Sequence, residues 1–170
     1  MSTAISVYHG PFGRAALYHL DRPMTLHAHR EGHLVLHVAS AAACLSVGGL
    51  TTPCDPTHAV AVNPWEIHDF TPCSGGDGTI CLVLYIKPNW FAAHDAHGRH
   101  KLRFARSKIQ LNDQLRRLIQ LISLRLEKAA EDGEFDQCLF ALTDGCYRAA
   151  GEQAGCDAGL CADKTGFNDF

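Results

Sequence analysis

The chain has 170 residues, of which 46% are hydrophobic, and a formal net charge of −3, which predicts a globular protein with a real core. A domain that binds nucleic acid usually presents a basic face to the phosphates. Here lysine and arginine are spread along the chain, so it is a poor DNA binder by itself. No apolar run approaches the roughly 20 residues of a membrane-spanning helix, and residues 1–12 do not resemble a secretion signal. We therefore expect a cytoplasmic protein without membrane contacts.

Short strand-like segments separated by glycine and proline fill the first half of the chain. A leading arm and a turn at 10–13 precede the first of them. Alternation of apolar residues then predicts strands at 15–20, 25–29, 33–39, 44–47, 58–62, 67–71 and 79–86. Strands this short and this closely spaced are typical of an antiparallel barrel or sandwich of jelly-roll type. The fold is therefore predicted to be mainly β.

From residue 111 the apolar period changes to that of an α-helix. Asn112 or Asp113 can cap the start of this helix, and Gly133 can close its end. A second amphipathic stripe begins near Glu134. The short connection predicts an antiparallel pair of helices.

The predicted organisation has three parts: a barrel with its arm at 1–110, a helical hairpin at 111–150, and a glycine-rich linker or disordered tail at 151–170. Leu121 and Leu124 lie off the buried stripe of the first helix. They would pack either on the barrel or against a second subunit.

Histidines suggest where the chemistry lies. His27 and His29 are two residues apart, so on an extended strand both side chains point the same way. His33 and His68 could join them inside a barrel. Neutral imidazole is a common ligand for zinc, nickel and iron, so these four side chains could hold a divalent metal.

The alternative is a pocket of neutral histidines beside Trp65 and Tyr85, which would bind a small organic molecule through hydrogen bonds and stacking. We favour this pocket because the carboxylate expected at a catalytic iron site is missing. Glu31 and Glu66 have the wrong parity and are expected to point outward.

Parity across residues 30–32 stays open. A one-residue bulge there would replace His33 and His37 by Leu34 and Leu36 as residues facing the pocket.

Four features together resemble the N-terminal cupin domain of AraC-family transcriptional regulators, over roughly residues 25–150. They are the histidines of the 27–33 segment, the Gly48-Gly49 hairpin, the Asn-Pro-Trp-Glu-Ile-His turn at 63–68, and the closing strand before Pro88. The resemblance implies a cupin-type double-stranded β-helix (jelly-roll) barrel followed by an antiparallel helix pair. It also implies a small-molecule effector, a homodimer formed through helices 111–150, and a helix-turn-helix domain after the linker.

By the same resemblance, the pocket would include His68, Phe70, Cys81 and Val83, and the arm before Leu17 could fold over the ligand. Two departures from the family pattern matter.

Cupin enzymes usually keep a glutamate where this chain has His33, which favours a protein that is not an enzyme, although a four-histidine metal site stays open. The chain also stops where the family would enter its DNA-binding half, so we expect this sequence to be part of a longer regulator that contacts DNA only through that missing domain.

Two hypotheses follow. The leading one is a ligand-sensing and dimerisation module of an AraC-type regulator. The other is a free-standing cupin metalloprotein or metalloenzyme that uses His27, His29, His33 and His68.

Overall fold

The computed structural model describes residues 3–73, 78–94, 102–128 and 133–162, with the backbone alone for 153–162. Its strands form two antiparallel sheets. The six-stranded sheet contains, in spatial order, β1 (Thr3–Gly10), β2 (Gly13–Leu20), β9 (Thr79–Ile86), β4 (Gly32–Ser40), β7 (His58–Val62) and β10 (Lys108–Gln110). The four-stranded sheet contains β3 (Met24–His27), β8 (His68–Pro72), β5 (Ala43–Val47) and β6 (Leu50–Cys54).

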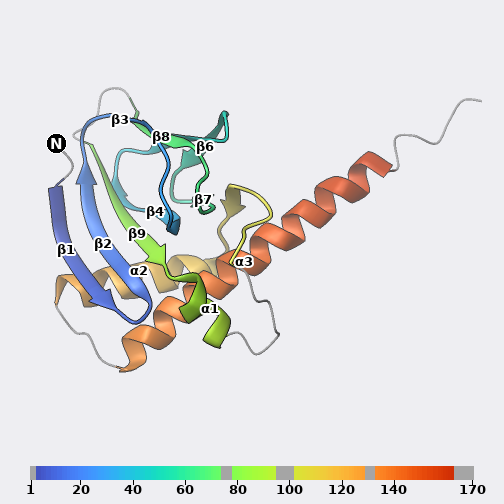
Figure 1. Ribbon diagram of the computed structural model, residues 1–170. Helices are drawn as coiled ribbons and strands as arrows, with labels where there is room; N and C mark the ends of the chain where they lie inside the picture. The colour runs from blue at the N-terminus through green and yellow to red at the C-terminus, as the bar shows by residue number, and fades with distance from the viewer. Residues whose placement is uncertain (1–2, 74–77, 95–101, 129–132, 163–170) are drawn as a thin grey trace, which may run out of the picture.

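Strands β2 to β9 form the eight-stranded jelly roll that cupins share. Their spatial order is β2-β9-β4-β7 in one sheet and β3-β8-β5-β6 in the other. The chain therefore crosses between the sheets at most of its turns, and the two sheets lie over one another (Figure 1). The predicted mainly β fold of cupin type is confirmed.

The six-stranded sheet buries both of its faces. Val35 and Val83 belong to the apolar cluster between the sheets. Leu34 and Leu84, one residue along each strand, belong to a second cluster that includes the helices. The pairing of β4 with β9 runs without a shift from Gly32 to His37, and His33 faces the space between the sheets whereas Leu34 belongs to the outer cluster.

Helices α2 (Asp113–Glu127) and α3 (Gly133–Ala162) cover the outer face of this sheet and run in opposite directions, which confirms the predicted helix pair (Figure 1). The Asn112 side chain caps α2 by accepting from the Leu115 N–H at 2.9 Å. The helix ends at Lys128, whose N–H donates to the Leu124 carbonyl, and not at Gly133 as the sequence suggests. A short helix, α1 (Pro88–His94), follows β9.

The leading arm is an edge strand and does not lie over the cavity. Strand β1 pairs with β2 along its whole length. The Ser6 hydroxyl donates to the Leu126 carbonyl at 2.8 Å, and the Tyr8 ring meets Phe135 edge-on at 4.9 Å between centroids. The arm thus packs on the helices, while His9, Gly10 and Pro11 line the cleft beside the cavity; the fold-over onto a ligand that the family resemblance implies stays a prediction.

Helix α3 continues to Ala162, whereas the sequence suggests a linker or disordered tail from residue 151. Three glycines in 151–162 argue against a helix, but alanine, glutamate, glutamine and leucine, all good helix formers, fill many of the other positions. Because the helix already has a buried first half, adding residues costs no new nucleation. Residues 163–170 lie outside the described residues.

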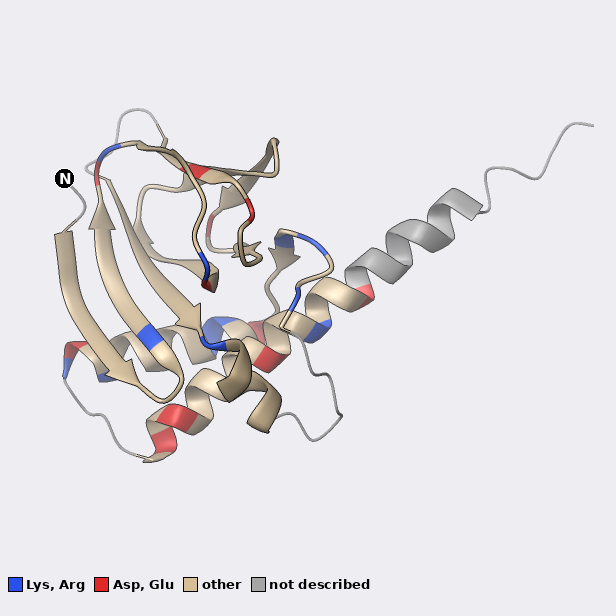
Figure 2. Cartoon of the chain, in the orientation of Figure 1, with Lys and Arg blue, Asp and Glu red and all other residues tan. Residues whose placement is uncertain are grey.

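Charged side chains of both signs lie on the helices (Figure 2). Arg125 pairs with Glu134 at 2.7 Å, and Arg148 pairs with Asp144 at 3.0 Å. The described part of the helices therefore presents no wholly basic face to a phosphate backbone. None of the described helices is long and apolar enough to cross a membrane.

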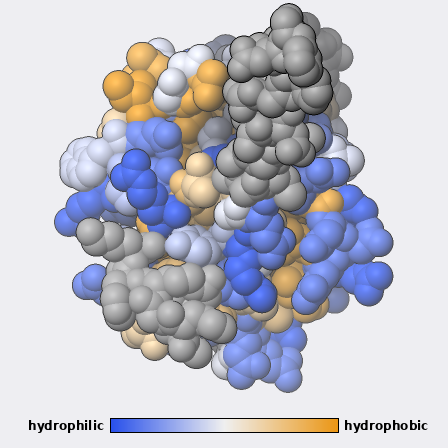
Figure 3. All heavy atoms as spheres, turned by 90° about the vertical axis from the view of Figure 1, so that its right-hand side faces the viewer, coloured by the Kyte–Doolittle hydropathy of each residue, from blue (hydrophilic) through white to orange (hydrophobic). Residues whose placement is uncertain are grey.

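Two groups of large apolar side chains stay exposed. Leu121 and Leu124 of α2 are 40% and 52% exposed, so they do not pack on the barrel. Leu26, Leu50 and Ile67 lie on or next to the four-stranded sheet, whose outer face no helix covers. Figure 3 shows apolar surface in the upper part of the molecule, at the level of this sheet in Figure 1.

Candidate functional site

A cavity of about 210 Å³ lies between the two sheets. One end is apolar, and the other end carries imidazole rings. The lining residues are Tyr18, Leu20, Met24, His27, His29, His33, Val35, Leu45, His68, Asp69, Phe70, Val83 and Tyr85. Cavities of this type, apolar with a few convergent polar groups, are the usual form of small-molecule sites.

The four predicted histidines come together at the polar end. His27 pairs with His68 across β3 and β8, and their ring centroids are 4.2 Å apart. His29 follows β3, and its ring lies 4.8 Å from that of His33 and 5.1 Å from that of His68. The structure thus brings all four predicted histidines into a single cluster.

Backbone carbonyls fix the orientation of two of these rings. His27 Nδ1 lies 2.7 Å from the Thr25 carbonyl oxygen, and His68 Nδ1 lies 2.8 Å from that of Glu66. A carbonyl oxygen only accepts, so each Nδ1 carries the proton and each Nε2 of the neutral ring keeps a free lone pair. Metal-binding histidines are typically held in this way.

Burial disfavours the charged form of three of the four imidazoles. Burial lowers the pKa of His29 and of His68, and it lowers the pKa of His33 furthest, with the neighbouring imidazoles adding to the effect. His33 is only 3% exposed, and its Nδ1 has no hydrogen-bond partner among the described residues. Neutral imidazole is the form that binds a metal.

The donor set fits a divalent metal. One ligand atom from each of His27, His29 and His68 lies within 4.8 Å of the others. Two nitrogens on one zinc ion, each at about 2.1 Å, are at most about 4.2 Å apart, so small rotations of the rings would suffice. His33 lies deeper, where its ring backs the other three.

The turn at 63–66 positions His29. Trp65 N–H donates to the His29 carbonyl at 2.8 Å, and the Asn63 N–H donates to Glu66 Oε2 at 2.9 Å. The Asn63 side chain also exchanges two hydrogen bonds with the backbone of Phe104. The Asn-Pro-Trp-Glu turn thus joins the histidine loop to the loop before β10.

Predicted ligand-binding residues divide into two groups. Phe70, Val83 and Tyr85 line the cavity. Cys81 is fully buried in the same apolar cluster but does not line the cavity. Trp65, expected beside the pocket, is 68% exposed and lies outside it, with a left-handed φ of 64°.

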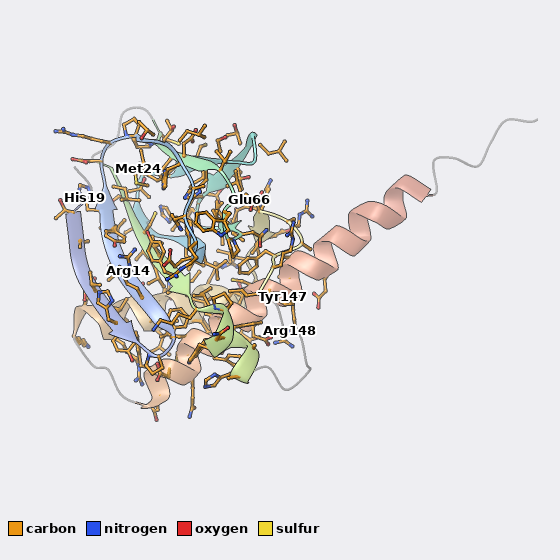
Figure 4. All side chains as sticks on the ribbon, in the orientation of Figure 1. Arg14, His19, Met24, Glu66, Tyr147 and Arg148 are labelled. Atoms are coloured by element: carbon orange, nitrogen blue, oxygen red, sulfur yellow. The ribbon has the colours of Figure 1, made fainter. Side chains whose placement is uncertain are left out.

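The two glutamates also differ from one another. The Glu66 carboxylate closes its own turn by accepting from the Asn63 N–H, and Figure 4 labels this side chain. Glu31 does not point away from the cluster, because its Oε2 lies 3.7 Å from His29 Nδ1. Residue 31 lies in the turn before β4, where strict alternation no longer applies.

A wider cleft of about 1110 Å³ adjoins the cavity, and His27, His29 and Tyr85 line both. The cleft is therefore the mouth of the cavity. Arg14, Arg30, Glu31 and Lys87 also line it. The sequence prediction missed Arg14, although its position on β2 two and four residues before Ala16 and Tyr18 places it on the same face as Tyr18.

No protein-family model matches the chain, and no curated protein matches it. Among solved structures it is similar to a cupin-2 domain from Rhodospirillum rubrum, at 21% identity and a TM-score of 0.39, over 49% of this chain and 57% of that one. KdgF from Halomonas sp. has 18% identity and a TM-score of 0.41, over 51% of this chain and 77% of that one.

A salicylate 1,2-dioxygenase from Pseudaminobacter salicylatoxidans has 12% identity and a TM-score of 0.35, over 47% of this chain and 21% of that one. Likenesses of this size say nothing about ligand or activity. The expectation that the chain is not an enzyme stays a prediction.

Proposed function

We propose that this chain is the effector-binding and dimerisation domain of an AraC-type transcriptional regulator, whose helix-turn-helix domain lies outside the given sequence. One observation carries the ligand-binding part: a cavity inside the jelly roll has an apolar end and a polar end of four imidazoles. Such a cavity can hold a small molecule by burial at one end and by directional bonds at the other.

A divalent metal such as zinc, nickel or iron fits His27, His29 and His68, with His33 behind them. When bound, it would supply a Lewis-acidic centre for an oxygen or nitrogen atom of the ligand. The carbonyl contacts of His27 and His68 support this role because they direct Nε2 into the cluster.

The six-stranded sheet offers a route from the cavity to the helices. Along β4 and β9, alternate residues face the cavity and the helical layer. An effector would change the packing of α2 and α3 only by binding one arrangement more tightly than another. The helical layer packed on this sheet supports the sensor, because a cupin that acts only through its barrel does not need such a layer.

Ligand binding can be tested by thermal denaturation with a library of small organic molecules. A compound that binds the cavity raises the melting temperature, by mass action on the folded state. Val83→Phe would fill the apolar end and abolish this rise. Val7→Phe, on the exposed edge strand, is the matched control and should keep it. A library without any stabilising compound would contradict the proposal.

Metal binding is tested by elemental analysis of the purified protein. We expect about one divalent metal per chain in the parent protein and none in a His27→Ala, His29→Ala double variant, because two of three ligands are lost. A His37→Ala, His58→Ala double variant is the control and should keep the metal. A metal that survives loss of His27 and His29 would place the site elsewhere.

The second candidate is a free-standing cupin metalloprotein or metalloenzyme, which the directed Nε2 atoms favour. The coding sequence after residue 170 separates the two. A helix-turn-helix domain is expected under the regulator, and a stop codon would favour the metalloprotein.

A further inference from the structure

Arg14, Tyr85 and His33 form one row across the inner face of the six-stranded sheet. Arg14 of β2 lies opposite Tyr85 of β9, and Tyr85 lies opposite His33 of β4. Residues directly opposite one another in a sheet share a face. The Arg14 guanidinium carbon lies 3.9 Å from the centre of the Tyr85 ring, and the Tyr85 and His33 rings stack at 5.2 Å. The row thus runs from the mouth of the cavity to its imidazole end.

The charge of Arg14 is not matched by an acidic side chain at the mouth. Its Nε is buried and has no hydrogen-bond partner among the described residues. The nearest carboxylate of the cleft, Glu31, lies 3.9 Å from Arg30 and 3.7 Å from His29 instead. Lys87 donates to the Gly10 carbonyl. The guanidinium contacts Tyr85, but its buried Nε–H still lacks an acceptor, which favours a ligand that supplies one.

The cavity wall beyond the imidazoles is mainly apolar. Leu20, Met24, Val35, Leu45 and Phe70 line it, together with two polar side chains, Tyr18 and Asp69. The Asp69 carboxylate accepts from the Ser46 N–H at 3.2 Å. Figure 4 shows Met24 and Arg14 at different heights of the sheets. A ligand that fills both regions has a compact apolar body and an anionic head. Because the guanidinium is a planar fork, the head that suits it is a carboxylate or a phosphate.

The mouth favours the single charge of a carboxylate. A phosphate monoester carries about −1.5 to −2 charges at neutral pH, and Glu31 stands beside the same imidazoles. We propose that the cavity recognises a small monocarboxylate, with Arg14 on the carboxylate and the apolar body between the sheets. This assignment rests on the proposed function, since it names the ligand class of the same cavity.

The test is a panel of matched pairs, each a carboxylate and its neutral amide: butanoate, hexanoate, benzoate and phenylacetate against butanamide, hexanamide, benzamide and phenylacetamide. Isothermal calorimetry or thermal denaturation of the full 170-residue chain gives each Kd. At least one carboxylate should bind roughly 10- to 100-fold more tightly than its amide, the ratio expected for charge-assisted hydrogen bonds. Addition of phenyl phosphate tests the competing anion, and it should bind more weakly than benzoate.

Variants locate the effect. Arg14→Gln should reduce the preference to within about twofold, because the amide keeps the length but not the charge, and Arg14→Lys should retain part of it. Arg103→Gln is the control, since this arginine is exposed and lines neither the cavity nor the cleft; it should leave the preference unchanged.

Equal affinity within every pair, or a preference that survives Arg14→Gln, would overturn the carboxylate assignment. If the amides bind equally well and Val83→Phe abolishes their binding, the ligand cavity stands and only the class is wrong. If nothing in the panel binds, the carboxylate assignment fails, and the metal analysis and the wider library then decide on the proposed function.

Discussion

At the scale of single residues, burial of His29, His33 and His68 lowers the pKa of each and so disfavours their charged forms. His33 has no compensating partner for its buried Nδ1 among the described residues, and a buried polar atom without a hydrogen bond is costly. Its neighbours are imidazoles that are themselves half-withdrawn from water. The cluster therefore resists the uptake of further protons. Neither a metal, which binds the lone pair of a neutral imidazole, nor a ligand carbonyl, which accepts from a neutral N–H, needs that added charge.

The metal-free protein should lose stability as the pH falls below 6.5. Unfolded histidine protonates near its ordinary pKa of 6.5, whereas burial lowers the pKa of folded His33 well below that value. Between the two pKa values the unfolded chain binds more protons, so its free energy falls relative to the folded state. Each such histidine contributes a slope of about 1.4 kcal/mol per pH unit. Urea denaturation of chelator-treated protein from pH 5 to 8 measures it.

His33→Leu isolates this contribution. The variant should show a shallower pH dependence, because the buried titratable group is gone. Val35→Leu, a neighbour on the same strand face, changes packing without removing a titratable group and should keep the full slope. An identical slope in the parent and in His33→Leu would contradict the assignment.

At the scale of elements, two turns hold the mouth of the cavity. Gly13 begins β2 directly after the β1–β2 turn, with a positive φ of 139°, and a Cβ there would overlap the carbonyl oxygen of Tyr85. The close approach keeps β2 against β9, where Arg14 lies opposite Tyr85. The turn at 63–66 holds the other side of the mouth, where the Trp65 N–H donates to the His29 carbonyl.

Gly13→Ala should destabilise the protein by more than the usual cost of placing a side chain at positive φ, which is about 1–2 kcal/mol. The added methyl group meets backbone, which cannot move without breaking the β2–β9 ladder. Gly49→Ala is the control, because Gly49 also has a positive φ, of 83°, but has nothing within 4 Å of the added Cβ. Chemical denaturation measures the loss in free energy of unfolding for both variants. Equal losses would contradict the prediction, because the structure would then have accommodated the contact with the Tyr85 carbonyl.

Asn63→Ala should lower the free energy of unfolding by about 1–3 kcal/mol, since it removes two hydrogen bonds to the Phe104 backbone and leaves those groups partly buried. Asn89→Ala, on the exposed side of α1, should change it by less than about 0.5 kcal/mol. If Asn63→Ala proved neutral, the loop before β10 would not depend on this side chain.

At the scale of the whole molecule, the two apolar periods in the sequence were enough to predict most strands and the helix pair, whereas the inward face of β4 was left open. It failed where long-range packing decides. Arg14 becomes a cavity residue only because β2 pairs with β9, a contact between segments about seventy residues apart. Trp65 was expected beside the pocket, where its ring could stack on a ligand, but the turn that holds His29 directs it to solvent.

The cluster itself was easier to predict than its contents. Spacing alone places His27 and His29 together, and β3–β8 pairing adds His68. Whether the imidazoles hold a metal depends on ring rotations that move their nitrogen atoms by a few tenths of an ångström. Residue spacing in the sequence does not encode movements this small. The same limit applies to Glu31, because residues in a turn have no fixed parity.

The exposed leucines of α2 carry the last prediction, that two copies of the chain associate through this helix. Leu121 and Leu124 lie three residues apart, hence on one helix face, and they stay exposed while the apolar stripe beside them is buried. A Leu121→Glu, Leu124→Glu double variant should shift the protein from dimer to monomer in analytical ultracentrifugation, because charges are poorly tolerated at the centre of an interface. Leu50→Glu, at 71% exposure on β6, is the control and should remain dimeric. Ligand binding in the cavity should be the same in the parent chain and in both variants. A parent chain that sediments as a monomer at every concentration, or a double variant that stays dimeric, would show that this face is not the interface.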